Sequence, residues 1–153
     1  MTIRITQKRN PTHLLEAESL PVLLLTAEER EKARQRLLLG DGRKLVLQLP
    51  RGSVLVPGEI LCTAEDVPVA VIQAQAEPVF TLRAQDPFAL LRAAYHLGNR
   101  HVAMELARDY LRIKPDHVLA HLIEHLGGVA CVEEIAPFLP DHGAYRNHHH
   151  EHA

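Results

Sequence analysis

Histidine is the residue type with the clearest chemical potential in this sequence. The chain has 153 residues, of which 11 are histidine, and His148, His149, His150 and His152 fall within the last six positions. The imidazole nitrogen is a ligand that suits nickel, copper and zinc. It must be neutral to bind metal, and an unperturbed imidazole is mostly neutral above pH 7. The histidine content therefore predicts a metal-binding protein without indicating what the metal is for.

A second group of histidines follows the spacing of a helix. His117, His121 and His125 stand four residues apart, so in a helix they share one face. The opposite face would carry the apolar residues Val118, Leu119, Leu122, Ile123 and Leu126. We expect this helix to bury its apolar face and to present the histidines to solvent or to a partner. His117 is a candidate metal ligand, and the alternative is a solvated polar face that happens to use histidine.

Recognisable catalytic motifs are missing from the sequence. It shows no phosphate-binding glycine loop, paired-carboxylate motif or nucleophile–base arrangement, so we expect a protein that is not an enzyme. A zinc-dependent hydrolase that uses Glu124 is the competing class. The segment from His121 to His125 does not match the HExxH motif, because Glu124 directly precedes the second histidine.

Composition and charge argue against several other classes. The 17 basic and 19 acidic side chains give a net charge of −2, which offers no electrostatic footprint for nucleic acid. The longest apolar run, Leu20 to Leu25, is far too short to cross a membrane. The first 13 residues hold no apolar segment typical of a secretory signal. Cys62 and Cys131 form no CxxC pattern, so we expect two buried thiols in a cytoplasmic protein.

The first half of the chain is typical of short strands joined by turns. Thr26 and Glu29 form a capping-box pattern that predicts a helical turn, which by propensity could continue to Leu39. Asp41-Gly42 predicts a type I′ hairpin turn between residues 36–40 and 44–49. Further strands are predicted at 3–6, 20–25, 60–63 and 67–75. We therefore expect a small all-β domain over residues 1–76.

The second half mixes helices and strands. A strand is predicted over 79–84, and Asp86-Pro87 starts a helix that we expect to end at Leu97, with Gly98 just beyond it. Asp116 caps a second helix that ends at Gly127, and a last strand is predicted over 131–136.

Residues 102–113 leave two interpretations open. Their composition favours a helix, but they also fit two short strands that turn at Arg108-Asp109. The second interpretation gives the order β-α-β-β-α-β of a ferredoxin-like unit. We accordingly predict an α+β protein with a ferredoxin-like domain over 77–142. A polar, disordered, histidine-rich tail is predicted over 143–153.

The segment from Ala94 to His101, which reads Ala-Tyr-His-Leu-Gly-Asn-Arg-His, resembles the signature of the UreE family of urease accessory nickel chaperones. Other segments resemble that family in the same order along the chain. They are 36–58 with its Asp-Gly hairpin, 116–119 followed by Leu126-Gly127, and 138–145 followed by the histidine-rich end. The resemblance covers nearly the whole chain.

The resemblance implies a function and a set of partners. It implies a homodimer formed through the C-terminal domains, with Ni²⁺ held between the subunits by His101. It also implies delivery of nickel to the urease apoprotein through a complex with the urease accessory GTPase, with the N-terminal domain contacting partners. One departure concerns a His-x-His pair that some members carry before the second helix. Here that place reads Pro115-Asp116-His117, which retains only the second histidine.

Two imidazoles from a dimer are too few to hold nickel tightly, so further ligands must come from elsewhere. The histidines of the tail (His148, His149, His150 and His152) are the obvious donors. Zn²⁺ is the second candidate metal, since it uses the same ligand type. A passive nickel or zinc store is the alternative function, and it would need the tail but not His101.

Overall fold

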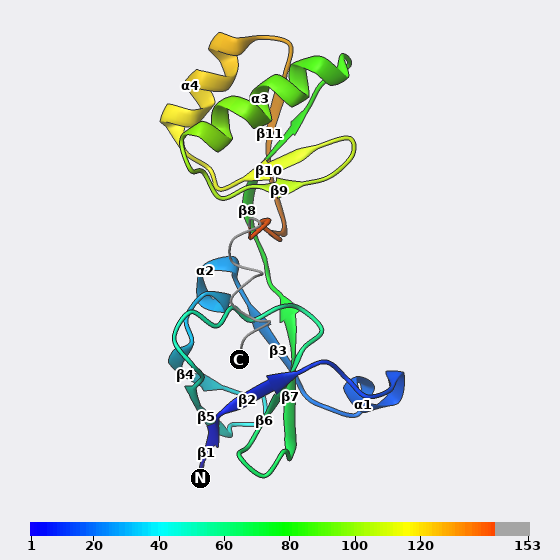
Figure 1. The fold of residues 1–153 in the computed structure, drawn as a ribbon, viewed down its shortest axis with the longest axis vertical. Coiled ribbons are helices and arrows are strands. Elements are labelled where there is room, and N and C mark those ends of the chain that lie inside the picture. The colour runs from blue at the N-terminus through cyan, green and yellow to red at the C-terminus, as the bar shows by residue number, and fades with distance from the viewer. Residues whose placement is uncertain (143–153) are drawn as a thin grey trace. The chain divides into compact units, whose positions relative to one another are not determined.

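The computed structural model describes residues 1–142, which divide into two compact units (Figure 1). The first unit is Met1–Gln75 and the second begins at Ala76. The predicted disordered tail lies outside the described residues. None of the helices over residues 1–142 is both long enough and apolar enough to cross a bilayer.

The first unit contains two small sheets and two short helices. One sheet has the order β1-β5-β4, with β1 at Thr2–Ile5, β5 at Lys44–Gln48 and β4 at Arg34–Leu38. The other has the order β2-β6-β7-β3, with β2 at Gln7–Arg9, β6 at Ile60–Cys62, β7 at Pro68–Ala74 and β3 at Val22–Leu25. The helices are α1 at Leu14–Glu18 and α2 at Ala27–Arg30.

Buried apolar and exposed polar side chains alternate along the strands, and the buried ones form the core of this unit. In β5, Leu45 and Leu47 are buried whereas Lys44 and Gln48 are exposed, as expected for a strand with one solvated face. The inward side chains join a single apolar cluster that also includes Ile5, Leu25, Leu39, Leu61 and Ile72. One face of the three-stranded sheet therefore packs in the core, and its other face is exposed to solvent.

The predicted extension of the helical turn to Leu39 is wrong. The capping box at Thr26 and Glu29 is present, but α2 ends at Arg30 and β4 begins at Arg34. Residues 34–38 alternate between exposed and half-buried positions, because Gln35 and Leu37 face the core beside Leu47 and Leu45 of β5. Pairing with β5 thus overrides the local helix propensity.

The Asp41-Gly42 hairpin is confirmed, but its predicted turn type is wrong. A type I′ turn needs a positive φ at both central residues, whereas here Gly42 has φ of 90° and Asp41 does not have a positive φ. The Gly42 N–H donates to the Leu39 carbonyl at 2.9 Å, and the Leu39 N–H donates to the Arg43 carbonyl at 2.9 Å. This is a longer loop in which only Gly42 needs the left-handed conformation.

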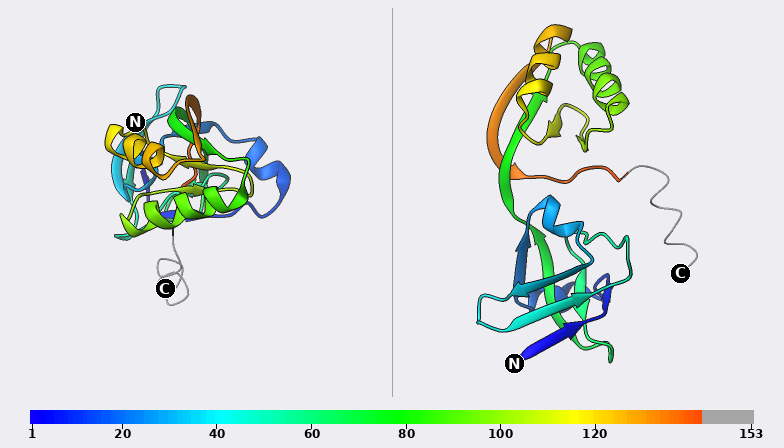
Figure 2. Two further views of the ribbon diagram at one scale, coloured as in Figure 1. Left: turned by 90° about the horizontal axis from the view of Figure 1, so that it is seen from above. Right: turned by 90° about the vertical axis from the view of Figure 1, so that its left-hand side faces the viewer.

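The second unit is one antiparallel sheet with two helices. Its elements follow the order β8 (Ala76–Arg83), α3 (Pro87–Asn99), β9 (Glu105–Leu106), β10 (Leu111–Ile113), α4 (His117–Leu126) and β11 (Ala130–Pro137). The sheet order is β11-β8-β10-β9, and every neighbouring pair is antiparallel. The two helices lie side by side (Figures 1 and 2).

Both helices of the second unit pack on the same face of its sheet. Leu90, Ala93 and Leu97 of α3 and Ile123 of α4 are buried in one cluster with Leu82, Leu111 and Ile113 of the strands. Residues 105–113 thus form the hairpin and not the helix that their composition favoured. The reason is that Leu111 and Ile113 fill the space below the helices at the two-residue period of a strand.

Two predictions of burial in this unit need correction. Cys62 is buried as expected, but Cys131 is exposed because it lies in β11, the edge strand of its sheet. Val118 was assigned to the buried face of its helix, but it is 52% exposed because it stands at the border of the apolar face in the first turn.

The hairpin of the first unit yields a stability prediction. Substituting Gly42→Ala should lower the free energy of unfolding by about 1–2 kcal/mol, because an L-residue is strained at this positive φ. Gly40→Ala in the same loop is the matched control. Its φ is not positive and its Cβ would meet open space, so it should change stability by less than about 0.5 kcal/mol. Urea unfolding measures both, and equal effects would contradict this account of the loop.

Candidate metal site

His101 occupies the position that ends helix α3. The helix continues through Gly98 to Asn99, so the predicted end at Leu97 with Gly98 beyond it is wrong. The His101 N–H donates to the Gly98 carbonyl at 3.0 Å, and the Val102 N–H donates to the Leu97 carbonyl at 3.3 Å. This pair of bonds is the Schellman motif, in which the residue after the C-cap adopts the left-handed conformation.

The left-handed residue of this motif is usually glycine, but here it is His101. Its φ is 57°, and Asp66 is the only other non-glycine residue with positive φ in the described range 1–142. Val102 and Leu97 lie in the same apolar cluster, which is the hydrophobic contact that accompanies the motif. The packing therefore fixes the backbone of His101 in a conformation that costs an L-residue about 1–2 kcal/mol relative to the right-handed one. A strained position held by its surroundings is typical of a functional site.

His101 lies on the surface of the second unit. His101 is exposed, and so are Gly98, Asn99 and Arg100 before it. His96, one turn earlier in α3, is half-buried, and its ring meets the Tyr95 ring edge to face with centroids 5.3 Å apart. This ring contact favours a packing role for His96. The chain therefore offers His101 as a side chain open to a ligand from outside the helix.

The histidines of α4 are all exposed, as their spacing predicted. His117 is the first residue of the helix, and Asp116 caps it by accepting from the Val118 and Leu119 N–H groups at 2.8 and 3.1 Å. His121 and His125 follow on the same exposed face, while Ile123 is buried. Among residues 1–142, no three His, Cys, Asp or Glu side chains are grouped to hold a metal ion. The predicted ligands His148, His149, His150 and His152 lie outside those residues.

The C-terminal segment, residues 138–142, is anchored beside the loop that carries His101. The Asp141 N–H donates to the Met104 carbonyl at 2.8 Å, and the Leu139 N–H donates to the Glu105 carboxylate at 2.7 Å. Met104 is only three residues beyond His101, so their Cα atoms are at most about 11 Å apart. His142, which the sequence analysis did not single out, directly follows the anchored Asp141.

Glu105 is the centre of this anchor. Glu105 is only 7% exposed. The carboxylate oxygen that does not bind Leu139 accepts from the Tyr110 hydroxyl at 3.0 Å and lies 3.5 Å from the Arg112 guanidinium. The hydrogen bond to Glu105 raises the pKa of the Tyr110 phenol. Arg112 also stacks over the Tyr110 ring, with its guanidinium carbon 4.5 Å from the ring centroid. A buried carboxylate with three partners can hold the C-terminal segment firmly.

Arg112 extends the network across the sheet. Its Nε donates to Thr81 at 3.1 Å, and its terminal nitrogen lies 3.4 Å from the Glu134 carboxylate. Thr81 also donates to Glu134, and these contacts lower the pKa of the Glu134 carboxyl, the Thr81 bond contributing most. The anchor is therefore tied to β8, β10 and β11, three of the four strands that support helix α3.

Two family models match the chain almost from end to end. Residues 3–74 match the N-terminal domain, and residues 77–153 the C-terminal domain, of the UreE urease accessory protein. A protein named urease accessory protein UreE from Nostoc punctiforme is 50% identical over 130 residues, which are 85% of this chain and 87% of the relative. A protein of the same name from Thermosynechococcus vestitus is 44% identical over 138 residues, or 90% of this chain and 94% of the relative.

These matches define the class as a two-domain urease accessory protein. The chain belongs to the UreE family of urease accessory proteins. Its members assist an enzyme and are not enzymes themselves, so the zinc hydrolase considered above is dismissed.

The helix end at His101 predicts an order of stability. The His101→Gly variant should be more stable than His101→Ala by about 1 kcal/mol, because glycine alone is free of strain at φ of 57°. The two substitutions remove the same imidazole, so each is the control for the other. Urea unfolding compares them, and an alanine variant that matches or exceeds the glycine variant would rule out the left-handed conformation.

The anchor predicts a large loss of stability from one carboxylate. Glu105→Ala should lower the free energy of unfolding by about 3 kcal/mol, because it leaves Arg112 and the Leu139 N–H without their buried partner. Glu124→Ala on the exposed face of α4 is the control and should cost less than about 0.5 kcal/mol. Thermal unfolding followed by circular dichroism measures both, and a loss below about 1 kcal/mol at Glu105 would contradict the anchor.

Proposed function

We propose that this chain is a nickel metallochaperone that delivers Ni²⁺ to apo-urease while the active site of the enzyme is assembled. The observation that carries the proposal is His101, an exposed imidazole fixed in a strained conformation within the segment that resembles the nickel-binding signature of its family. Nickel is the cargo and Zn²⁺ a competing ion. The proposed setting is the cytoplasm, and the proposed partners are the urease accessory GTPase and the urease apoprotein.

The proposal includes a homodimer, and the outer face of α3 supports it. Phe88, Leu91 and Tyr95 recur at three- and four-residue intervals and are each about two-thirds exposed. With Leu106 of β9 and Met104 they line an open apolar hollow. Because the opposite face of α3 is buried in the core, the helix is apolar on both sides, and an apolar face of this kind is typical of an interface.

A two-fold axis near this face would explain how one histidine per chain makes a site. Each subunit presents the same surface to the other across such an axis, so the two His101 side chains can approach each other. We infer that the second unit is a ferredoxin-like domain whose helix α3 serves both dimerisation and metal binding. Its βαββαβ order and its strand order β11-β8-β10-β9 support this inference.

The remaining ligands are proposed to come from the tail, and the anchor at Glu105 supports that role. His148 follows the anchored Asp141 by only seven residues in the sequence. His149, His150 and His152 follow at once. His117 is proposed as a secondary ligand at the start of α4. A set of imidazoles without thiolate can hold Ni²⁺ and still release it, which suits a carrier.

Nickel titration of a single-site variant tests the proposal. His101→Ala should weaken the tightest nickel site by more than about tenfold, because even outer residues of metal sites are worth about that much. His121→Ala removes an equally exposed imidazole from α4 and should leave that site unchanged. Isothermal titration calorimetry measures the nickel affinity of both variants. If the tightest nickel site of His101→Ala has the affinity of the unmodified chain, passive metal storage is the remaining function.

Deletion of residues 143–153 tests the tail separately. The shortened chain should bind fewer nickel ions per dimer and hold the His101-dependent ion more weakly, because four candidate imidazoles are removed. Its dimer should persist, since the apolar face of α3 is intact. Calorimetry gives stoichiometry and affinity, and light scattering gives the mass. If stoichiometry and affinity both match those of the full chain, the tail donates no ligand.

A further inference from the structure

The outer face of the three-stranded sheet in the first unit carries an unusual distribution of charge. Its three strands contain no aspartate or glutamate. Four cations point to the exposed side, namely Arg4 of β1, Lys44 of β5, and Arg34 and Arg36 of β4. We call these four side chains, together with the neighbouring Leu38 and Val46, the basic face.

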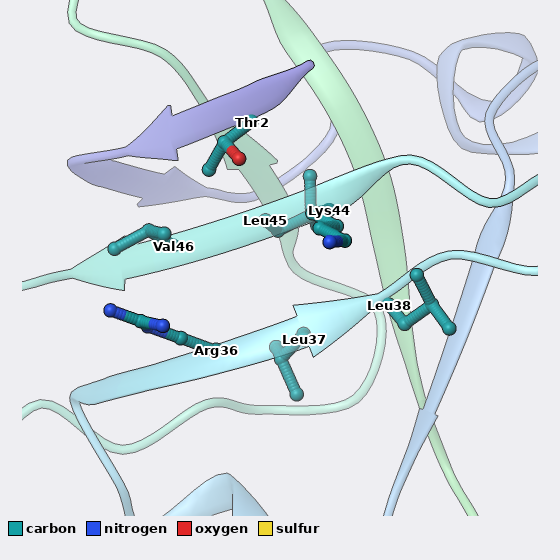
Figure 3. A pocket seen from close by; sticks show the side chains of 7 residues that line it. All are labelled: Thr2, Arg36, Leu37, Leu38, Lys44, Leu45 and Val46. Carbon is teal, nitrogen blue, oxygen red and sulfur yellow. The ribbon is translucent and has the colours of Figure 1, made fainter.

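The strand register arranges the basic face in rows. Arg4 and Arg36 flank Val46 in one row, and Thr2 and Leu38 flank Lys44 in the next. Figure 3 shows Arg36 beside Val46, and Lys44 between Thr2 and Leu38. Since neighbouring strands are about 4.8 Å apart, the backbones of Arg4 and Arg36 are about 10 Å apart. All of these residues except Arg4 contribute to the lining of one pocket.

None of the four cations forms an ion pair with any residue in the range 1–142. By contrast, other cations of this unit are paired: Lys8 with Glu59 at 2.7 Å, Arg9 with Glu16 and with Asp66, and Arg43 with Asp41 at 2.8 Å. The chain as a whole has a net charge of −2, so this concentration of positive charge is local. Like charges this close oppose one another, and an opposite charge from outside would relieve them.

The apolar residues within the basic face indicate what kind of surface fits it. Leu38 is 63% exposed and Val46 is half-buried, and both lie among the cations. Val46 lies between Arg4 and Arg36, and Leu38 lies beside Lys44 at the edge of the sheet. Exposed apolar side chains next to arginine are typical of a protein interface. A long polyanion such as DNA would meet only four cations and would be repelled by the net negative charge of the rest of the chain. Arginine, which supplies three of the four cations, pairs with carboxylates through two parallel hydrogen bonds.

We propose that the basic face is a docking surface for an acidic protein patch, in which aspartate or glutamate side chains surround an apolar contact. The cations would raise the rate of encounter and set the orientation of the partner. This surface lies in the first unit and is separate from His101. It requires neither bound metal nor the proposed nickel delivery, so the two proposals can fail independently.

Binding of fluorescein-labelled poly-L-glutamate to the full-length protein tests this proposal. The measurement is fluorescence anisotropy at low salt and pH 8, where unperturbed imidazoles are neutral. The Arg36→Gln/Lys44→Gln double variant should lose at least about tenfold in affinity, with a smaller dependence on salt. The matched control is Arg51→Gln/Arg108→Gln, which removes two exposed cations elsewhere and should change affinity less than twofold. Circular dichroism checks that all variants keep the fold.

Two further arms separate the proposed partner class from other anions. Duplex DNA and phosphatidylserine vesicles are titrated under the same conditions as poly-L-glutamate. Weaker binding of both than of poly-L-glutamate, with sensitivity confined to the Arg36/Lys44 variant, supports the proposal. An equal loss in the control variant would overturn it. So would tighter binding of DNA or vesicles that the Arg36/Lys44 variant abolishes.

Discussion

The end of helix α3 is the constraint on which the candidate site depends. The Schellman hydrogen bonds and the packing of Leu97 and Val102 in one cluster require the residue directly before Val102 to adopt the left-handed conformation. Glycine would meet this demand at the least cost, yet the chain has His101 there. The gain is an exposed imidazole that leaves the helix at a fixed place. The strain is local, and the buried residues Leu90, Ala93 and Leu97 hold the helix that bears it.

A second set of contacts connects this helix end to the C-terminal segment. The Glu105 carboxylate accepts from the Leu139 N–H, and the Met104 carbonyl accepts from the Asp141 N–H. Glu105 and Met104 both lie within four residues of His101. In our account, the loop after α3 therefore has two tasks, presenting one histidine and setting the point from which the histidine-rich end departs. A carrier benefits from such a division. In the proposed carrier, His101 would define where the ion is held and the histidines of residues 148–152 would supply further ligands.

Local chemistry made part of this fold predictable. Asp86-Pro87 and Asp116 marked helix starts correctly, because a cap depends on a few neighbouring atoms. The end of α3 was misplaced because Gly98 looks like a terminating glycine, whereas packing of Val102 on Leu97 decides where the helix stops. The pairing of β1 with β5 in parallel, and the short elements β2 and α1, were not predicted, since they depend on contacts between distant segments.

The candidate metal site was predictable only in part, because it too depends on contacts between distant segments. Resemblance pointed to His101 but not to its left-handed backbone, which no pattern of residue types reveals. Glu105 and Leu139 are 34 residues apart, so no local spacing signals their hydrogen bond.

The central claim is that one nickel ion is shared by two chains through His101. It is tested most directly by titrating nickel into the full-length protein while its mass is followed by native mass spectrometry. The account predicts a dimer before metal is added and a first, tight ion bound once per dimer. Tight binding of one ion per monomer, with no dimer present, would contradict it.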